Sequence, residues 1–417
     1  MSTETKKETR ESWKTPTVMG SLAAVVLVFF GILGKPESVA FELTGVREAV
    51  QLPNIDVPSN VLGIASGILL LAIAGFVAWQ VAKNIRSSIW FSIVFGAIAL
   101  VALLGWLAGG QVVPVAFILG SALVLAVPIM LGAMAGVMSE RVGVVNIAIE
   151  GQLLTGAFMA SVVSTLTGNQ IFGIISAMIT AALFSAVLAV FAIRFLAQQI
   201  IVGVVLNVLA IGITNFLYQQ WVTEDESATN SPGTLPIIHI PVLGDIPIIG
   251  PVLFQNRIIV WLAIAIVIVL WFVLFKTKLG LRARAVGENP LAADTVGINV
   301  GRTRFWWVTL GGLLAGLGGA ALTIGSSGSF GREMSGGLGF IALAVVILGR
   351  WHPGYATAAA LLFGFSIILR VWANQVSPGI PTNFITMVPY IVTIIAVVGF
   401  VGRSRPPAAD GIPYVKG

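Results

Sequence analysis

Long apolar runs recur along the whole length of this 417-residue chain, and they decide what it can fold into. A helix needs about 20 mainly apolar residues to cross the hydrocarbon core of a bilayer. Twelve runs qualify, at 18–34, 61–82, 88–108, 112–137, 142–166, 171–193, 199–219, 257–275, 305–325, 337–349, 354–372 and 385–402. With 57% hydrophobic and 10% charged residues, the chain has too much apolar surface for a soluble fold to bury. The runs predict an all-α polytopic membrane protein with about twelve transmembrane helices.

Two of the twelve runs are open to another interpretation. The run at 337–349 is short, and the run at 142–166 contains Glu150. Either can be a broken or re-entrant element instead of a full span.

The positions of lysine and arginine support the count and orient the helices. If all twelve runs span, 18 of the 23 Lys and Arg residues lie on the side of the N-terminus. Positive charge marks the cytoplasmic side, so both termini are predicted to be cytoplasmic. The polar tail at 1–17 precedes a first run without a small-residue cleavage site, and we expect this run to be retained. The net charge of +6 follows the topology instead of forming one patch, so no nucleic acid is expected as a partner.

Motifs for chemistry are missing from the sequence. The chain has no cysteine and no G-x-x-x-x-G-K-[ST] string, which a phosphate-binding loop for ATP requires. The two histidines, His239 and His352, fall in loops on opposite sides of the membrane and cannot share a metal. We therefore expect no catalytic residue, no metal and no cofactor bound by this chain.

A predicted inside loop at 276–304 carries the signals of a short helix. Asn289 can accept a hydrogen bond from an unpaired backbone N–H, and Pro290 suits the first helical position. Gly297 can adopt the left-handed conformation that ends a helix. A helix this short is not stable alone. It is either part of a solvated linker or a docking helix for a cytoplasmic partner.

The predicted outside loop at 220–256 is long and contains five prolines. Such a loop is a rigid connection across the mouth of the bundle or, alternatively, a lid.

Five polar residues are candidates for the path of a solute: Asn146, Glu150, Asn207, Asn215 and Ser327. An acidic residue within a span usually faces the bundle interior or a water-filled cavity. Asn146 lies one helical turn before Glu150, which predicts that both project from one face. Asn207 and Asn215 are eight residues apart and also fall close to one face. For Glu150 and the three asparagines the alternative is a hydrogen bond between neighbouring helices. For Ser327, which lies at the outer end of a span, the alternative is a plain turn.

Small residues recur in two similar strings, GQLLTG at 151–156 and GGLLAG at 311–316. They indicate either two related halves, as in many transporters, or a chance match in a chain rich in Gly and Leu. The spacing of Gly311, Ala315 and Gly316 favours close helix packing.

Three strings together resemble the permeases of ABC importers for sugars, nucleosides and branched-chain amino acids. The first is Gly287-Glu288-Asn289-Pro290 followed by Ala292-Ala293 and Gly297-Ile298, and it is similar to the coupling loop of that family. The second runs from Glu140 to Gly151, and the third is Gly349 to Gly354 followed by Leu361 to Gly364. They lie in the family's order and cover roughly residues 112 to 402.

The resemblance implies a permease core at 111–402, with extra transmembrane helices at 18–110 and a cytoplasmic tail at 403–417. It implies that a partner ATPase hydrolyses ATP and docks on Gly287, Glu288, Asn289, Pro290, Ala292, Ala293 and Gly297. It further implies a second permease chain (a copy or a sibling), an extracellular solute-binding protein and a location in the lipid of the cell membrane.

The string at Glu140–Gly151 is most similar to the nucleoside branch, so nucleosides are the expected solutes and simple sugars the alternative. A stand-alone secondary transporter with Glu150 as its ion site is a second alternative. A membrane-embedded enzyme has no support beyond isolated polar residues.

Overall fold

The computed structural model describes residues 13–34, 36–45, 48, 50–85, 87–376, 387 and 405–416. Within them, ten helices are long and apolar enough to cross a membrane, and they coincide with ten of the predicted runs. These spans are α1 with η1 (Lys14–Val25, Val26–Ile32), α2 (Ser59–Ala82), α3 (Ile89–Ala108), α4 (Val115–Glu140), α5 (Ile149–Thr167), α6 (Gln170–Ile193), α7 with η2 (Gln199–Leu217, Tyr218–Val222), α9 (Ile258–Lys276), α12 with η4 (Val300–Leu322, Thr323–Ser327) and α14 (Pro353–Val376). The prediction of a polytopic helical membrane protein is confirmed. Of the predicted run at 385–402, all residues but Met387 lie outside the described part of the chain.

The predicted span at 337–349 is a short helix, α13 (Leu338–Leu348), of 11 residues. It is about 16 Å long, half of the roughly 30 Å that a hydrocarbon core measures. The residues before it are not helical, since Gly336 and Gly337 have positive φ. This helix is too short to span a membrane by itself, and the interpretation of 337–349 as a broken element is confirmed.

The predicted span at 142–166 also enters the bundle without helical structure. After α4, residues 144–146 have no regular structure, and α5 begins only at Ile149. Gly132 lies about two turns before the last residue of α4. A Cβ atom on it would lie 3.1 Å from both Ile149 and Ala342. Both α5 and α13 therefore contact α4 in the bundle interior. Because Asn146 precedes the helix, the prediction that it shares a helical face with Glu150 is wrong.

Small residues let α5, α6 and α12 pack with their backbones nearly touching. A Cβ atom on Gly156 of α5 would lie 2.9 Å from the Cα of Gly316 in α12. One on Gly312 would lie 2.7 Å from the carbonyl oxygen of Ala181 in α6. The two G-x-L-L-x-G strings therefore meet at Gly156 and Gly316, and their close-packing role is confirmed.

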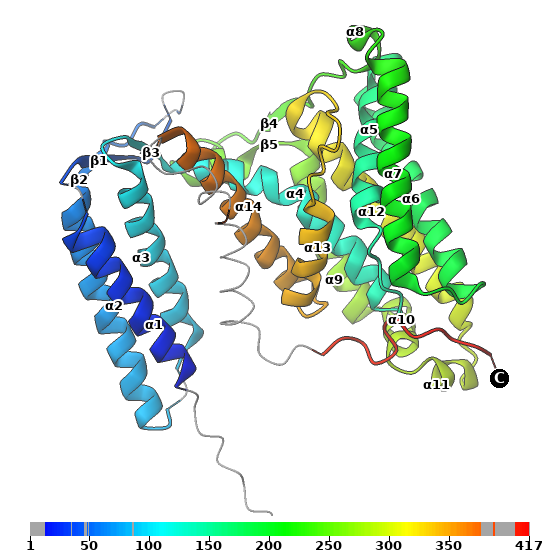
Figure 1. The fold of residues 1–417 in the computed structure, drawn as a ribbon, viewed down its shortest axis with the longest axis horizontal. Coiled ribbons are helices and arrows are strands. Elements are labelled where there is room, and N and C mark those ends of the chain that lie inside the picture. The colour runs from blue at the N-terminus through cyan, green and yellow to red at the C-terminus, as the bar shows by residue number, and fades with distance from the viewer. Residues whose placement is uncertain are drawn as a thin grey trace, which may run out of the picture.

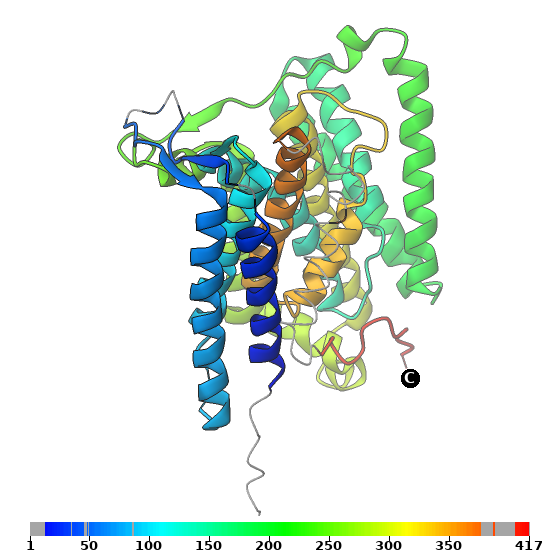
Figure 2. The same cartoon turned by 60° about the vertical axis from the view of Figure 1, so that its left-hand side comes forward.

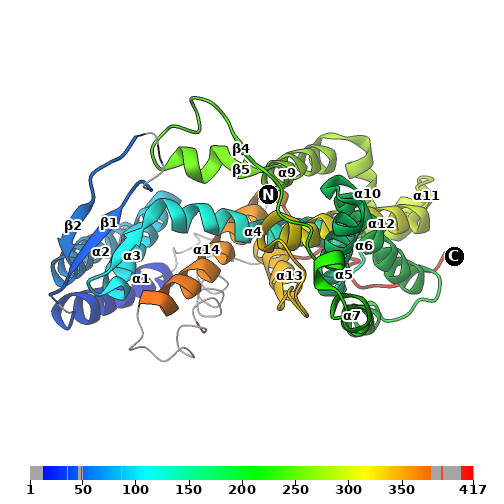
Figure 3. The same cartoon turned by 90° about the horizontal axis from the view of Figure 1, so that it is seen from above.

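The first three helices stand to one side of the others (Figures 1 and 3). They carry a three-stranded sheet of β1 (Ser38–Glu42), β2 (Ile55–Pro58) and β3 (Val112–Pro114) in the order β2-β1-β3. β1 pairs antiparallel with β2 and parallel with β3. A cluster around Val39, Leu104, Ile118 and Trp372 packs these helices against α4 and α14. We call this end of the bundle the sheet end.

The loop at 220–256 runs across the sheet end (Figure 2). It contains α8 (Glu226–Thr229), β4 (Ile237–His239) and η3 (Gly250–Phe254), and β4 pairs with β5 (Gln255–Arg257). Arg257 anchors the loop by donating hydrogen bonds to the carbonyl oxygens of Leu235 (3.0 Å) and Gly325 (2.8 Å). These contacts fit a rigid connection, and a role as a lid stays a prediction.

Candidate functional site

Two short helices at the end opposite the sheets form the connection between α9 and α12, namely α10 (Lys278–Glu288) and α11 (Pro290–Thr295). The Asn289 side chain accepts a hydrogen bond from the Ala292 N–H at 3.0 Å, and Pro290 occupies the first turn. Gly297 follows with a φ of 84°. The predicted short helix and both of its ends are confirmed, while α10 was not predicted.

The two faces of α11 differ sharply in exposure. Ala293 is 3% exposed and packs into a cluster with Val286 and Val300. Leu291 is 63% exposed and Val296 is 74% exposed. The inner face therefore holds the helix in place. The outer face exposes apolar side chains on the end of the bundle opposite the sheets.

Gly287 brings α10 against the start of the connection between α4 and α5. A Cβ atom at this position would overlap the carbonyl oxygen of Arg141. No larger residue fits here unless the two segments separate.

The three strings noted in the sequence meet at this end of the bundle. Arg141 donates a hydrogen bond from Nε to the carbonyl oxygen of Trp351, at 2.9 Å. The Trp351 indole N–H donates to the carboxylate of Glu140. Phe275 lies beneath the guanidinium groups of Arg141 and Arg284. We call Glu140, Arg141, Gly287 and Trp351 the junction. It joins the end of α4, the end of α10 and the turn between α13 and α14.

The C-terminal residues also contact the junction. Their contacts there were not predicted from the sequence. The Ala409 N–H donates to the carbonyl oxygen of Gly287 at 2.9 Å. Arg304 is only 2% exposed, and it donates to the carbonyl oxygens of Val142 and Ile412, each at 3.0 Å. A fully buried arginine needs such partners to offset its desolvation.

Asp410 makes the binding of the C-terminal residues sensitive to pH. Burial raises the pKa of Asp410 from 3.8 to about 7, while the Gly411 N–H and Arg304 act in the opposite direction. Glu140 lies close enough for the two carboxyl groups to repel each other. The bound segment therefore holds a proton that the released segment gives up. Its attachment is strongest below pH 3.8 and weakens as the pH rises to about 7.

A spin label at Ile412 measures this dependence. We expect the label to gain mobility from pH 5 to pH 8, and Asp410→Asn to abolish the change. Equal pH dependence in both proteins would contradict this origin.

Glu150 lies in the bundle interior, where the first turns of α5 and α13 meet. It is 6% exposed, and its two carboxylate oxygens accept hydrogen bonds from the N–H groups of Gly337 (2.8 Å) and Gly339 (2.6 Å). The Ser335 hydroxyl donates to it at 2.7 Å. The first N–H groups of a helix have no partners within the helix, and its N-terminus carries a partial positive charge. The Glu150 carboxylate accepts hydrogen bonds from these N–H groups at α13, and its negative charge is attracted to the partial positive charge.

Asn146 and Asn207 lie beside Glu150 in the same polar cluster. Asn207 accepts from the Gly151 N–H at 2.8 Å and donates to the carbonyl oxygen of Ile147 at 2.9 Å. Asn146 exchanges two hydrogen bonds with Gln152, each at 3.2 Å. These bonds hold the non-helical entry to α5 in place. Contact of either asparagine with a solute stays a prediction.

The other two candidates lie elsewhere. Asn215 donates to the Glu333 carboxylate at 3.3 Å, and the Ser327 hydroxyl donates to the carbonyl oxygens of Leu322 and Ser329. The structure thus brings together Asn146, Glu150 and Asn207, but not Asn215 or Ser327.

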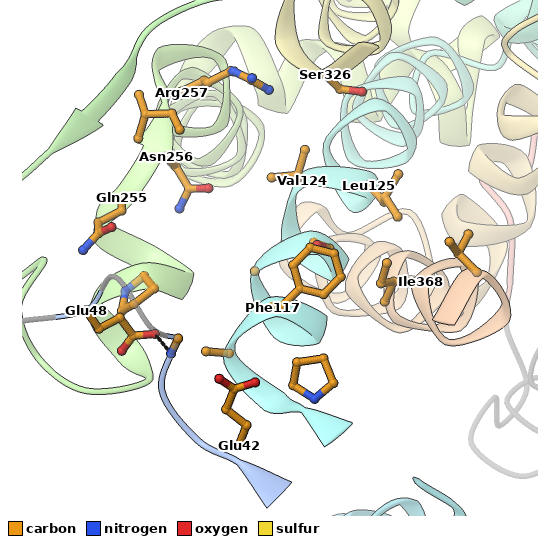
Figure 4. Close-up of a pocket in the computed structure, with 18 residues that line it drawn as sticks. Glu42, Glu48, Phe117, Val124, Leu125, Gln255, Asn256, Arg257, Ser326 and Ile368 are labelled. Carbon is orange, nitrogen blue, oxygen red and sulfur yellow. Dashed lines mark hydrogen bonds between the residues drawn. The ribbon is translucent and has the colours of Figure 1, made fainter. Parts of the chain in front are cut away.

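A cavity of about 750 Å³ opens near the sheet end (Figure 4), and none of the five candidates lines it. Glu42 and Glu48 of the N-terminal part, Phe117 of α4 and Gln255 of β5 form its walls.

The partners of Glu150 were not predicted from the sequence, although one signal for them is present. The string Ser335-Gly336-Gly337-Leu338-Gly339 directly precedes a short apolar run. The backbone N–H groups at a glycine-rich start of a helix are free to donate hydrogen bonds to an acidic side chain. Nothing local signals Arg304 or Ala409, because their partners are far away in the sequence.

Comparison with known proteins adds independent findings. A family model described as the permease component of branched-chain amino acid transport systems matches residues 118–397, which leaves α1–α3 outside the match. The guanosine ABC transporter permease protein NupQ of Bacillus subtilis (strain 168) is 41% identical over 309 residues, covering 72% of this chain and 97% of NupQ. The nucleoside ABC transporter permease protein NupC of Lactococcus lactis subsp. cremoris (strain MG1363) is 40% identical over 310 residues, covering 72% and 96%.

A third relative has a different solute in its name. The putative glucose ABC transporter permease protein TsgC13 of Haloferax volcanii is 35% identical over 256 residues, covering 61% of this chain and 77% of TsgC13. No solved structure matches the chain.

Proposed function

We propose that this chain, which belongs to the permease-component family of branched-chain amino acid transport systems, forms the path for nucleosides in an ABC importer. The observation that carries the proposal is the similarity, over nearly their whole length, to two permeases named for guanosine and nucleosides. The relative named for glucose keeps simple sugars as the alternative solute. The chain is a multi-pass protein of the cell membrane.

The end with α10 and α11 is the cytoplasmic end in this proposal. Lys276, Lys278, Arg282, Arg284 and Arg302 gather there, as the positive-inside rule requires. The exposed face of α11 then docks in a groove of the ATPase, and Gly287, Glu288, Asn289, Pro290, Ala292, Ala293 and Gly297 hold or present that face. The ATPase binds and hydrolyses ATP, and this chain binds no cofactor. A second permease chain and an extracellular solute-binding protein complete the importer.

Solute movement requires that the ATPase change the shape of the membrane bundle. The junction is the contact through which α10 reaches α4 and the connection to α5. The connection leads within a few residues to Glu150 and the start of α13. Movement of α11 is therefore passed to the polar cluster, where α5 and α13 begin, and opens the path alternately to each side.

Uptake by a reconstituted importer tests this proposal. The chain is placed in proteoliposomes with the ATPase, second permease and solute-binding protein from its genomic neighbourhood. We expect uptake of labelled guanosine that requires ATP and the ATPase. Uptake of glucose alone would identify a sugar importer, and gradient-driven uptake without the ATPase would identify a secondary transporter.

A further inference from the structure

The last described segment of the chain, residues 405–416, runs along the α10–α11 end and contacts several separate elements (Figure 1). Besides the Ala409 bond to Gly287, the Ala408 N–H donates to the Glu288 carboxylate at 3.3 Å. Tyr414 packs against the cluster that contains Ala293 of α11. The segment thus contacts α10 and α11, the two helices of the proposed docking site, on the faces that are turned toward the bundle.

On its opposite side, the segment lies close to the α4–α5 connection at two positions where only a glycine leaves enough room or has the required backbone conformation. Gly143 has a φ of 84°, and a Cβ atom on it would lie 2.8 Å from the carbonyl oxygen of Ala409. Gly411 has a φ of 73°, and a Cβ atom on it would lie 3.4 Å from Val145. The segment occupies a slot whose two walls are α10 and residues 142–145.

Arg304 of α12 locks the segment to the α4–α5 connection. One guanidinium donates to Val142 in the connection and to Ile412 in the segment. The Asp410 carboxyl group lies near the same guanidinium and near Glu140 of α4. These contacts join α4, α10, α11 and α12 through one stretch of chain.

We infer that residues 405–416 form a positioning element, which ties α10 and α11 to the α4–α5 connection so that movement of α11 reaches the polar cluster. The inference rests on the proposed docking of the ATPase at α11. A six-residue helix has little rigidity of its own, so it transmits movement only as far as its contacts extend. Apart from the segment, α10 meets the connection through packing, at Gly287 and in the apolar cluster that holds Val286 and Val142. The segment adds hydrogen bonds to Gly287 and Glu288 beside these packing contacts.

Removing residues 407–417 tests the inference in the assembled importer. We expect the ATPase to remain bound and to hydrolyse ATP, while guanosine imported per ATP falls about fivefold or more, the lower end of usual coupling between sites. Unchanged import per ATP would overturn the inference. Loss of ATPase binding would also overturn it, because the segment would then belong to the docking surface itself.

Point variants keep the test valid if the truncated chain does not fold. Ala409→Pro removes the N–H that bonds to Gly287, whereas Ala409→Gly keeps it. We expect Ala409→Pro to import less guanosine per ATP than the unchanged protein, and Ala409→Gly to import as much. Both variants should melt at the same temperature as the unchanged protein. Pro413→Ala, at an exposed position of the same segment, is the matched control. Equal coupling in the Pro and Gly variants would count against the inference.

A cross-link tests whether the segment stays in place during transport. The natural chain has no cysteine, so Glu288→Cys with Ala408→Cys gives a single possible disulfide. Because Glu288 belongs to the proposed docking end of α10, the oxidised and reduced forms of the same double variant are compared under conditions where the reduced form binds the ATPase and imports guanosine. We expect both forms to import equal amounts of guanosine per ATP. Loss of transport that a reductant reverses would show that the segment must detach, and would refute a permanent tie.

Ala292→Asp, on the exposed face of α11, separates this inference from the proposed function. If that variant leaves ATPase binding intact, docking at α11 fails whatever the segment does. If it abolishes binding while the truncation leaves coupling unchanged, the docking proposal stands and only the inference about residues 405–416 fails.

Discussion

Replacing Glu150 by alanine is expected to lower the free energy of unfolding by about 2–6 kcal/mol. The change leaves the N–H groups of Gly337 and Gly339 without partners in the bundle interior. A buried donor that loses its acceptor costs about 1–3 kcal/mol. The first turn of α13 should loosen, and with it the contact of α13 with α5. The measurement is the melting temperature of the purified protein in detergent, together with guanosine uptake.

Glu150→Gln separates the structural role of Glu150 from a role toward solute. The amide keeps one acceptor oxygen but turns an NH2 group toward an N–H donor, so we expect an intermediate loss of stability. Glu224→Ala, in the exposed outside loop, is the control and should change neither quantity. If Glu150→Gln melts like the unchanged protein but loses uptake, the carboxylate acts on the solute path and not as a cap of α13.

Aspartate at two adjacent positions of α11 is expected to have two different effects. Ala292 is exposed, so Ala292→Asp should insert normally and keep its melting temperature. An unpaired charge buried in the ATPase groove costs more than the roughly 1.4 kcal/mol that corresponds to tenfold in affinity. We therefore expect ATPase co-purification to fall by about tenfold or more.

Ala293→Asp should instead damage the permease itself. Ala293 lies in the cluster with Val286 and Val300, where a carboxylate has no partner. We expect a lower melting temperature in addition to the loss of the ATPase. Asn84→Asp, at an exposed position just beyond the end of α2, is the control for a negative charge outside α11. Normal ATPase binding by Ala292→Asp would contradict the assignment of α11 as the docking helix.

Much of the fold follows directly from local sequence. Ten helices lie where the apolar runs are, because a run of about 20 apolar residues has no stable place except a bilayer or a large core. The ends of α11 follow from Asn289, Pro290 and Gly297, since capping involves residues only a few positions apart. Close packing at Gly316 also follows from residue size alone.

Hydrophobicity did not determine where α5 and α13 begin. Residues 142–148 are as apolar as a helix, yet they run into the bundle without regular structure before α5 starts at Ile149. This start depends on Asn207 and Gln152, and the start of α13 depends on Glu150, which lies 187 residues from Gly337. A hydropathy profile reports only the apolar character of each residue, so it cannot show hydrogen-bond partners that are distant in the sequence.

The same reason explains what the sequence determined about this protein and what only the tertiary structure decided. The apolar runs and the alternation of charge determined a bundle of membrane helices, because each residue interacts with lipid or water by itself. The junction and the attachment of residues 405–416 depend on pairs such as Arg304 with Val142, which are 162 residues apart. Such contacts exist only after the helices have packed, so the tertiary structure alone connects α11 to the polar cluster.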